Sequence, residues 1–358
     1  MRIRLVLVPV VLVAFGAVAP AAAQSSTAEA RYAAQQAYRR AMVEARELYQ
    51  GRRGPEQSDT FSRKYRIGRD GRVSIQNVAG EISVSVGPGD EVSIEAVKRT
   101  RGDRSELNRV DVIVEEHAGR VDVRTERGAF FRDDHVSVDF TVIVPEGASV
   151  EMRSVSGNVR VNGVKGVVRA QSISGNVVAS NAPRVEYART VSGDVELTGV
   201  SMDSDVTAQS ISGNVRASGL KARALDISTV SGDVSLRDAN CERLNARSVS
   251  GGIDYNGSLT KNGRYDVSSH SGSVRFTLTS GTGFELNTTS FSGSLRSEFP
   301  LTLGGQPGGD VIVGPGSNTT IRRGRGRGPG SGVRAVFGDG SASLSLRTFS
   351  GDIVIARR

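Results

Sequence analysis

The feature that most constrains this chain is a short unit that recurs at nearly constant spacing. It reads Ser-Val-Ser-Gly-Asn-Val-Arg-Val at residues 154–161 and returns, with small changes, around further glycines. The repeat glycines are Gly157, Gly175, Gly193, Gly213, Gly232, Gly251, Gly272, Gly293 and Gly351. The first eight are 18–21 residues apart, and the last follows after 58. Such a period is typical of a stacked array, because one unit cannot bury its apolar face alone.

Apolar residues alternate with polar ones inside each repeat. In the first repeat Val155 and Val159 flank the glycine at two positions on either side, and Val150 and Met152 form an earlier pair. Alternation of β-branched residues predicts short strands with one buried face. The step between the two pairs is three residues, so we place the corner of the chain there and expect Val155, Val159 and the glycine to face inward. The sequence therefore predicts an all-β fold, a β-solenoid of 18–21-residue coils with its aliphatic side chains turned toward a shared interior.

One repeat departs from this register. Before Gly193, Val185 and Tyr187 stand out of phase with the corresponding apolar residues of the other repeats, and Pro183 lies just upstream. This pattern predicts a β-bulge or a shifted loop.

Polar residues form regular columns beside the glycine. Serine precedes it in all nine repeats, serine or threonine stands three positions before it, and asparagine or aspartate often follows it. We expect these residues to face outward as ladders. The favoured role is hydrogen bonding along the stack, and the alternative is a flat polar surface for sugar, mineral or ice. The candidate polar ladder comprises Asn158, Asn176, Asp194, Asn214 and Asp233.

The first residues have the pattern of a secretory signal. Arg2 and Arg4 precede an apolar run from Leu5 to Val18, and small residues end at Ala23. An uncleaved anchor is the alternative, but the run is short and contains a proline. No other stretch is long enough to span a bilayer, so we expect export to the periplasm, the cell surface or the medium, with no transmembrane segment after cleavage.

The rest of the chain divides by composition. Residues 24–60 are rich in helix formers and predict a helical spacer or linker, or alternatively a docking helix for a membrane or partner. Residues 61–149 predict a β segment that caps the solenoid, in which residues 77–82 resemble a degenerate repeat. The expected order continues with the repeat solenoid at 150–298, a Gly/Arg-rich insert with a loop at 299–340, and a closing coil at 341–358.

The insert places arginines among glycines, which predicts a flexible cationic loop that either keeps the chain soluble or contacts an anionic partner. Net charge is +8, and loss of Arg2 and Arg4 would leave a basic exported chain. Such a chain is attracted to anionic polysaccharide or cell-envelope surfaces, whereas export argues against nucleic acid. The candidate contacts are Arg322, Arg323, Arg325 and Arg327.

Motifs for catalysis are missing from the sequence. It has no nucleophile elbow, dinucleotide loop or phosphate loop, so we expect no catalytic residue, cofactor or metal site. His270 takes a position that is otherwise mostly apolar and is expected to be structural, and Cys241 to be a small buried filler. The enzymatic alternative is a polysaccharide lyase or hydrolase, but Asp194 and Asp233 would lie two coils apart, about 10 Å. A self-assembling envelope scaffold is a further alternative, since open solenoid ends can stack.

The repeated Ser-Gly-Asn-Val and Ser-Gly-Asp-Val units resemble a bacterial family. Matching features are Val144-Pro145-Glu146-Gly147 and the closing stretch at residues 346–353. The family comprises exported β-strand-repeat proteins of unknown function that carry the name "putative adhesin", and the resemblance covers residues 61–356. It implies a β-repeat architecture and a surface-attachment role, and it supplies no catalytic or cofactor residue; the Gly/Arg insert is not part of its pattern. The sequence thus favours an exported non-enzymatic protein with a repetitive polar surface.

Overall fold

The computed structural model describes residues 55–127, 136–279, 281–303, 310–313, 319–322 and 332–358. The predicted signal and nearly all of the predicted helical spacer lie outside these residues. Residues 55–358 belong to one compact unit, and its described part is all-β apart from the short 3-10 helix η1 (Arg104–Arg109).

The strands follow one another along the chain with short connections. The N-terminal strands are β1 (Gln57–Arg66), β2 (Arg72–Ala79), β3 (Ile82–Gly87), β4 (Glu91–Thr100), β5 (Val110–His117), β6 (Arg120–Arg127) and β7 (Ser137–Pro145). The central strands are β8 (Ser149–Ser156), β9 (Val159–Asn162), β10 (Val168–Ser174), β11 (Val177–Ser180), β12 (Val185–Arg189), β13 (Val195–Thr198), β14 (Ser201–Gln209), β15 (Val215–Ser231), β16 (Val234–Ser250), β17 (Ile253–Ser271) and β18 (Val274–Leu278). The last strands are β19 (Phe284–Ser292), β20 (Leu295–Ser297), β21 (Thr302–Leu303), β22 (Asp310–Val313), β23 (Thr319–Arg322), β24 (Gly332–Phe337), β25 (Ala342–Ser350) and β26 (Ile353–Arg357).

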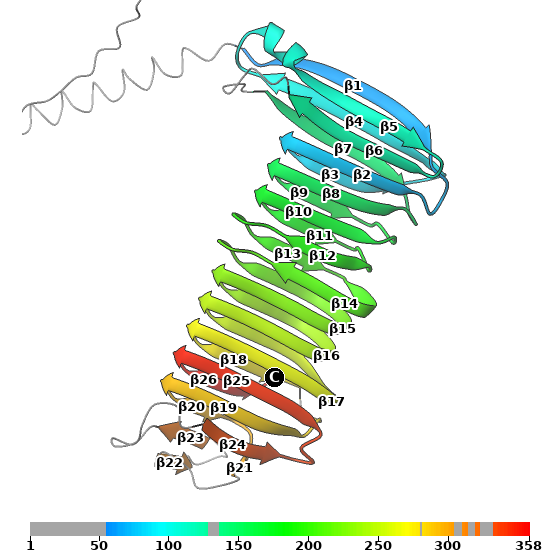
Figure 1. Ribbon diagram of the computed structural model, residues 1–358. Coiled ribbons are helices and arrows are strands. Elements are labelled where there is room, and N and C mark those ends of the chain that lie inside the picture. Colours follow the sequence, from blue (N-terminus) through cyan, green and yellow to red (C-terminus); the bar gives the residue numbers. More distant parts are fainter. Residues whose placement is uncertain (1–54, 128–135, 280, 304–309, 314–318, 323–331) are drawn as a thin grey trace, which may run out of the picture. The chain divides into compact units, whose positions relative to one another are not determined.

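Successive repeats pair in parallel and in register. Val177 lies opposite Val159 on one side and Val195 on the other, and Val168 lies opposite Val150. We call the strand residues on both sides of one repeat glycine a rung, and name the rung by its glycine. The rungs follow one another as adjacent strands in Figure 1. The parallel in-register pairing therefore brings chemically equivalent residues of successive repeats into columns.

The degenerate repeat at residues 77–82 forms a rung of its own. Asn77 pairs with Ser154, and Ile82 pairs with Val159, both in parallel strands. On its outer side β6 and β7 still pair in parallel with β2 and β3. The next pairs are antiparallel: β4 runs antiparallel to β7, and β1 runs antiparallel to β4. The N-terminal end of the ladder is therefore bordered by antiparallel strands.

The last repeat in the sequence is not the last rung. β25 pairs with β17 on one side and with β19 on the other, so the Gly351 rung lies between those of Gly272 and Gly293. The expectation of a closing coil at 341–358 is thus wrong in its position. The insert explains the reordering, because its strand β24 runs antiparallel to β19 and β23 runs antiparallel to β20. The chain returns across the outer side of the Gly293 rung before it pairs beside β17.

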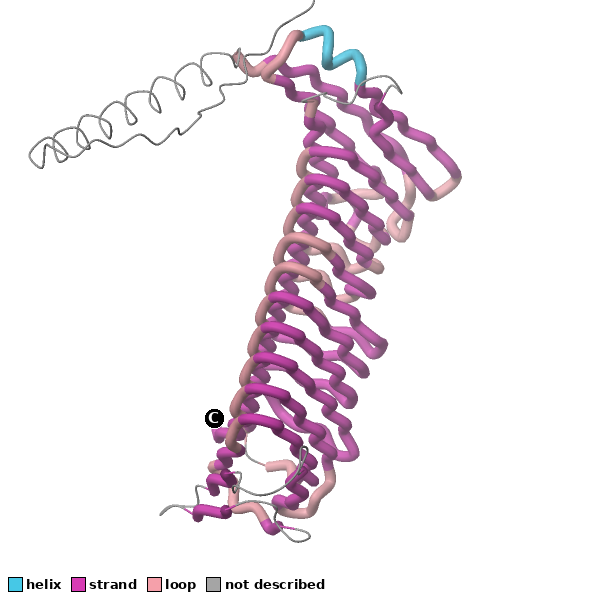
Figure 2. Tube along the Cα trace, turned by 60° about the vertical axis from the view of Figure 1, so that its left-hand side comes forward, coloured by secondary structure: helices cyan, strands magenta, loops and turns pink. Residues whose placement is uncertain are grey.

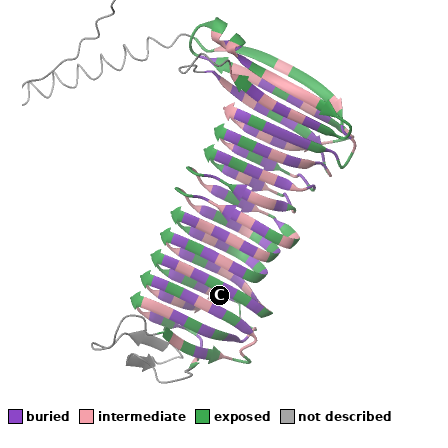
Figure 3. Ribbon diagram, in the orientation of Figure 1, coloured by how far each residue is buried: buried purple, intermediate pink, exposed green. Residues whose placement is uncertain are grey.

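The inward columns differ from the predicted ones. Val150, Met152 and Ser154 are buried before the glycine and Val159 after it, whereas Val155 is 46% exposed. Period-2 alternation therefore continues up to the hydroxyl residue, and the corner lies at the serine and glycine themselves. Figure 3 shows this alternation of buried and exposed residues along successive strands, and Figure 2 shows the connecting segments aligned along one edge. The prediction that the residue two before the glycine faces inward is wrong.

The corner also explains why the repeat requires glycine. A Cβ on Gly213 would overlap the backbone carbonyl of Gly193 in the neighbouring rung, and Gly213 has φ +153°. The same approach to the preceding glycine recurs at Gly175 and Gly232. Only a residue without a Cβ allows both the backbone conformation and this contact between rungs.

Two smaller predictions are confirmed. The pairing of β10 with β12 shifts by one residue between Val168 and Arg169, which is the bulge expected before Gly193. Cys241 is buried with 1% of its surface exposed, and burial raises the pKa of its thiol to about 12. A thiol in this state packs as a small apolar side chain and is unreactive.

Candidate binding surface

The serine and threonine residues three positions before the repeat glycines form a hydroxyl column, which is buried in every rung except that of Gly293. Thr229 is 3% exposed, and its hydroxyl donates to the carbonyl oxygen of Gly213 at 2.8 Å. Ser210 donates in the same way to Gly193, and Ser248 to Gly232. The expectation that this column faces outward is wrong, because its hydroxyls, apart from that of Ser154, donate to the glycine carbonyls at the corner. It cannot contact a ligand.

The column that follows the glycine carries the candidate polar ladder. The Asn158 side-chain oxygen accepts from the backbone N–H of Asn176, whose own side-chain oxygen accepts from the N–H of Asp194. Asp194 accepts from the N–H of Asn214 at 2.8 Å, and Asn214 accepts from that of Asp233. Each side chain thus provides an acceptor for the next rung. This is the stacking role favoured from the sequence, and a ligand-binding role for the ladder stays a prediction.

Asp194 is a ladder member that is both hydrogen-bonded to the next rung and ion-paired with an arginine. Burial acts to raise the pKa of its carboxyl group, but the backbone N–H of Asn214 and the Arg216 guanidinium, 2.8 Å away, outweigh this and lower it. Its side chain is 38% exposed. A carboxylate held ionised in this way serves as a hydrogen-bond acceptor and is a poor general acid.

Between these two polar columns lies an exposed column of apolar side chains, which we call the apolar stripe. The sequence interpretation placed these residues inside. In the structure the side chains of Ile211, Val230 and Phe349 are 45–50% exposed. In the order of the rungs the stripe comprises Val155, Ile173, Val191, Ile211, Val230, Val249, His270, Phe349 and Phe291.

The last three members of the stripe form an aromatic stack. The ring of His270 lies 4.8 Å from that of Phe349, which lies 4.6 Å from that of Phe291 with an angle of only 4° between the planes. His270 is exposed, so its predicted place in the interior is wrong. His270 continues a surface stack of rings, and no cluster of possible metal ligands occurs among the described residues. A structural role for His270 stays a prediction.

A shallow cleft on the same strands contains two arginines that the sequence interpretation did not single out. Arg247 lies opposite Ser268, and Ser268 lies opposite Arg347, so the two arginines are two rungs apart with a short side chain between them. Both are exposed. The cleft has a volume of about 200 Å³ and is also lined by Asn245, Asp266, Val267 and Ser345. Both arginines stand four positions before a repeat glycine, which places them in one column. The sequence does not show that they lie close together, because their rungs are not consecutive in the chain.

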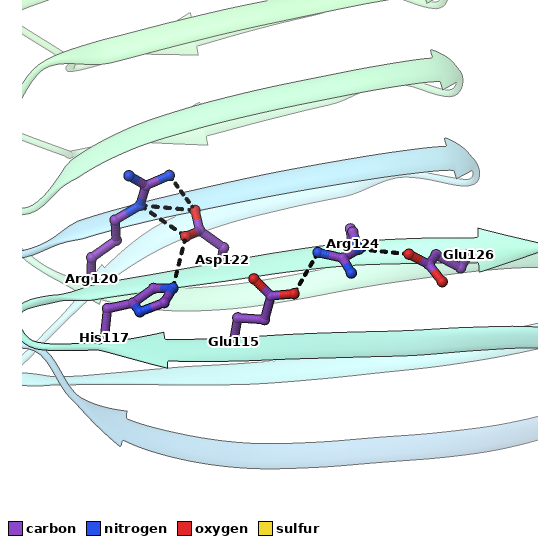
Figure 4. A network of polar contacts seen from close by, with 6 residues as sticks. All are labelled: Glu115, His117, Arg120, Asp122, Arg124 and Glu126. Atoms are coloured by element: carbon purple, nitrogen blue, oxygen red, sulfur yellow. Dashed lines mark hydrogen bonds and ion pairs between the residues drawn. The ribbon is translucent and has the colours of Figure 1, made fainter.

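Charged residues at the N-terminal end neutralise one another. On β5 and β6, Arg120 contacts Asp122, and Arg124 contacts both Glu115 at 2.6 Å and Glu126 at 2.8 Å (Figure 4). His117 lies 3.9 Å from Asp122. The Arg124–Glu115 pair joins the two strands, whereas the other two arginine pairs lie within β6. Pairs of opposite sign stabilise an exposed hairpin face, so these arginines are already bound within the chain.

A second cleft of about 660 Å³ lies among the turns near the N-terminal strands. Its charged lining residues are Arg69, Asp70, Glu146 and Lys165, and Lys165 is paired with Glu146 at 2.6 Å. The charges are of both signs and the cleft is open, so it defines no particular ligand.

The arginines of the insert fall largely outside the described residues. Arg322 ends β23, and Arg323, Arg325 and Arg327 follow it in the part of the chain that is not described. Their contact with an anionic surface stays a prediction. No helix within the described ranges is long and apolar enough to cross a membrane.

Together, an all-β ladder of Ser-Gly rungs and its regular side-chain columns define a β-repeat protein. The model of the family described as Toastrack DUF4097 matches residues 91–306, and this chain belongs to that family. It is a domain-of-unknown-function family, as the sequence resemblance implied.

Solved structures show a distant likeness. A "putative adhesin" from Bacteroides fragilis is 11% identical, with 83% of this chain and 97% of that chain covered and a TM-score of 0.41. A "putative adhesin" from Parabacteroides distasonis is 12% identical, with coverages of 84% and 97% and a TM-score of 0.40. A "putative lipid binding protein" from the same species is 11% identical, with coverages of 62% and 90% and a TM-score of 0.37. No curated protein matches the chain.

Proposed function

We propose that the chain is an exported, non-enzymatic β-solenoid with coils of 18–21 residues that attaches to anionic polysaccharide at the cell envelope. The observation that carries this proposal is the exposed pair Arg247 and Arg347 in one cleft. Guanidinium groups bind carboxylates through paired N–H donors, which fits acidic sugars. Adjacent rungs are about 4.8 Å apart, so the two arginines stand about 10 Å apart along the stack.

The other lining groups favour a sugar over a densely charged polymer. Asn245, Ser268 and Ser345 offer amide and hydroxyl groups, and Asp266 can accept from sugar hydroxyls. Asp266 would also repel a ligand with closely spaced phosphates. The cleft therefore suits a polymer whose carboxylates are separated by neutral hydroxyl-bearing parts.

The arginine cleft is tested by binding of the full chain to immobilised polygalacturonate, with dextran as the neutral reference polymer. Arg247→Ala combined with Arg347→Ala is expected to weaken binding roughly tenfold or more, because two charge-assisted contacts are lost. The matched control is Arg237→Ala, an exposed arginine on β16 outside the cleft, which is expected to leave binding unchanged. Binding should also fall as salt is raised. Equal binding by the double variant and the wild type would contradict the assignment.

The insert arginines provide a separate arm of the same experiment. Replacing Arg323, Arg325 and Arg327 by serine is expected to reduce binding without abolishing it, since their positive charges would add long-range attraction to an anionic polymer. Product analysis of the incubated polymer tests the non-enzymatic role: cleavage that is lost in Asp194→Asn or Asp233→Asn would favour the lyase or hydrolase alternative.

A mature chain that begins at Gln24 is expected if the signal is cleaved, and N-terminal sequencing of exported protein measures this.

A further inference from the structure

The apolar stripe is an extended exposed feature of the described strands that the proposed function does not use. Its residues sit in a single column across the nine repeats, a length of about 38 Å at about 4.8 Å per rung. Val155, Ile211 and Phe349 are each 46–50% exposed. A soluble protein rarely leaves so long a continuous apolar row in water unless something covers it.

The columns on either side of the stripe differ in charge. The column two positions before the stripe contains Arg153, Arg189, Arg247 and Arg347 and no acidic residue. The column three positions after the stripe contains Asp194, Asp233 and Asp352 and no basic residue. The stripe thus separates a cationic border column from an anionic one; within the same chain, Arg153 is paired with Glu151 and Asp194 with Arg216. An anionic membrane would attract the first border and repel the second, whereas a surface with the same two borders in reverse order would attract both.

A second copy of this chain has that surface. We propose that the apolar stripe is a self-association interface, in which two copies pack stripe against stripe around a two-fold axis parallel to the stack. This axis reverses the order of the borders, so the arginine column of each copy faces the aspartate column of the other. It also keeps equal rungs at equal height, which sets Arg189 opposite the partner's Asp194. Arg347 lies opposite the partner's Asp352 in this arrangement, so acidic polysaccharide bound in the arginine cleft and the second copy would compete for Arg347.

The opposite orientation is disfavoured by the same charges. If the copies ran antiparallel, each arginine column would face an arginine column and each aspartate column an aspartate column. Like charges facing each other across an interface weaken association and select against that arrangement. In the parallel arrangement identical β-branched side chains also meet at one height, a packing that excludes water efficiently.

Sedimentation velocity of the full chain over a range of concentrations tests the interface. The wild type is expected to be a dimer that dissociates on dilution. Ile211→Glu places two carboxylates against each other near the middle of the stripe and should raise the dissociation constant roughly tenfold or more. The matched control is Ile143→Glu: Ile143 is 41% exposed on β7, outside the stripe, and this variant should stay dimeric. Circular dichroism establishes that both variants are folded.

Two results would overturn the interface. One is a wild type that stays monomeric at every concentration, whether or not it binds vesicles of phosphatidylglycerol. The other is an Ile211→Glu variant that associates as strongly as the wild type.

Cysteine pairs test the orientation. Ser174 and Ser271 are exposed, stand beside the stripe and lie in rungs far apart, and the native Cys241 is buried and does not interfere. In the parallel dimer Ser174→Cys alone, and Ser271→Cys alone, should each give a disulfide-linked dimer under mild oxidation. If neither variant cross-links by itself but a mixture of the two does, the copies are antiparallel and the proposed axis is wrong.

Discussion

At the residue scale, the repeat glycine and the two side chains that bond around it determine the corner. The glycine carbonyl receives the hydroxyl of the next rung, as in Thr229 with Gly213, and the following N–H is bound by an amide or carboxylate oxygen, as in Asn214 with Asp194. The consensus Ser/Thr-x-Ser-Gly-Asn/Asp therefore encodes hydrogen bonds between rungs. A missing donor would leave a buried carbonyl without a hydrogen bond, which would lower the stability of the folded chain.

Replacing Gly213 by alanine tests the close approach of the rungs. The added Cβ would overlap the Gly193 carbonyl, so we expect the free energy of unfolding to fall by about 2–4 kcal/mol, measured by urea denaturation. Gly281→Ala is the matched control, because Gly281 has a similar φ of +144° but open space around its Cβ position. An equal loss in both variants would show that backbone conformation, and not contact between rungs, requires the glycine.

At the element scale, the sequence predicts the strands and their pairing better than it predicts which residues face water. The period, the degenerate rung at residues 77–82 and the bulge before Gly193 follow from spacing and composition alone. The exposure of Val155 and the burial of Ser210 do not, because the buried hydroxyl of Ser210 has its hydrogen-bond partner, the Gly193 carbonyl, in the neighbouring rung. Apolar character alone therefore suggested the wrong place for the corner.

The polar ladder makes a pH-dependent contribution to the free energy of unfolding, and a substitution of Asp194 can measure it. The pKa of this carboxyl group is lowered in the folded chain, so its stabilising effect is present above the pKa of an unfolded aspartate, about 3.9, and is lost as pH falls through the folded value. Asp194→Asn keeps the acceptor for the Asn214 N–H but loses the ion pair with Arg216. We expect the variant to be less stable by under about 1 kcal/mol near pH 7, because the pair is partly exposed.

The difference between wild type and Asp194→Asn should shrink as pH falls below about 4, where the wild-type carboxyl becomes protonated. Urea denaturation at several pH values measures it. A difference that stays constant over this range would mean that the charge of Asp194 contributes nothing to stability.

At the scale of the whole molecule, the stack brings together residues that are far apart in the chain. Arg247 and Arg347 share a cleft because the Gly351 rung lies beside that of Gly272. Neither this order nor the cleft could be predicted from the sequence, because the length of the 58-residue gap does not determine on which side of the Gly293 rung the last repeat pairs. The candidate arginines of the insert were recognised from composition, whereas those of the cleft depend on the order of the rungs.

Distances between spin labels test the order and register of the rungs most directly. Labels are placed at equivalent positions three residues after a repeat glycine, in one variant at Glu196 and Val354 and in another at Glu196 and Arg296, and the samples are diluted with unlabelled protein. With about 4.8 Å per rung, the account predicts about 24 Å from Glu196 to Val354 and about 29 Å from Glu196 to Arg296. A longer distance to Val354 than to Arg296, or broad distributions without a preferred distance, would contradict it.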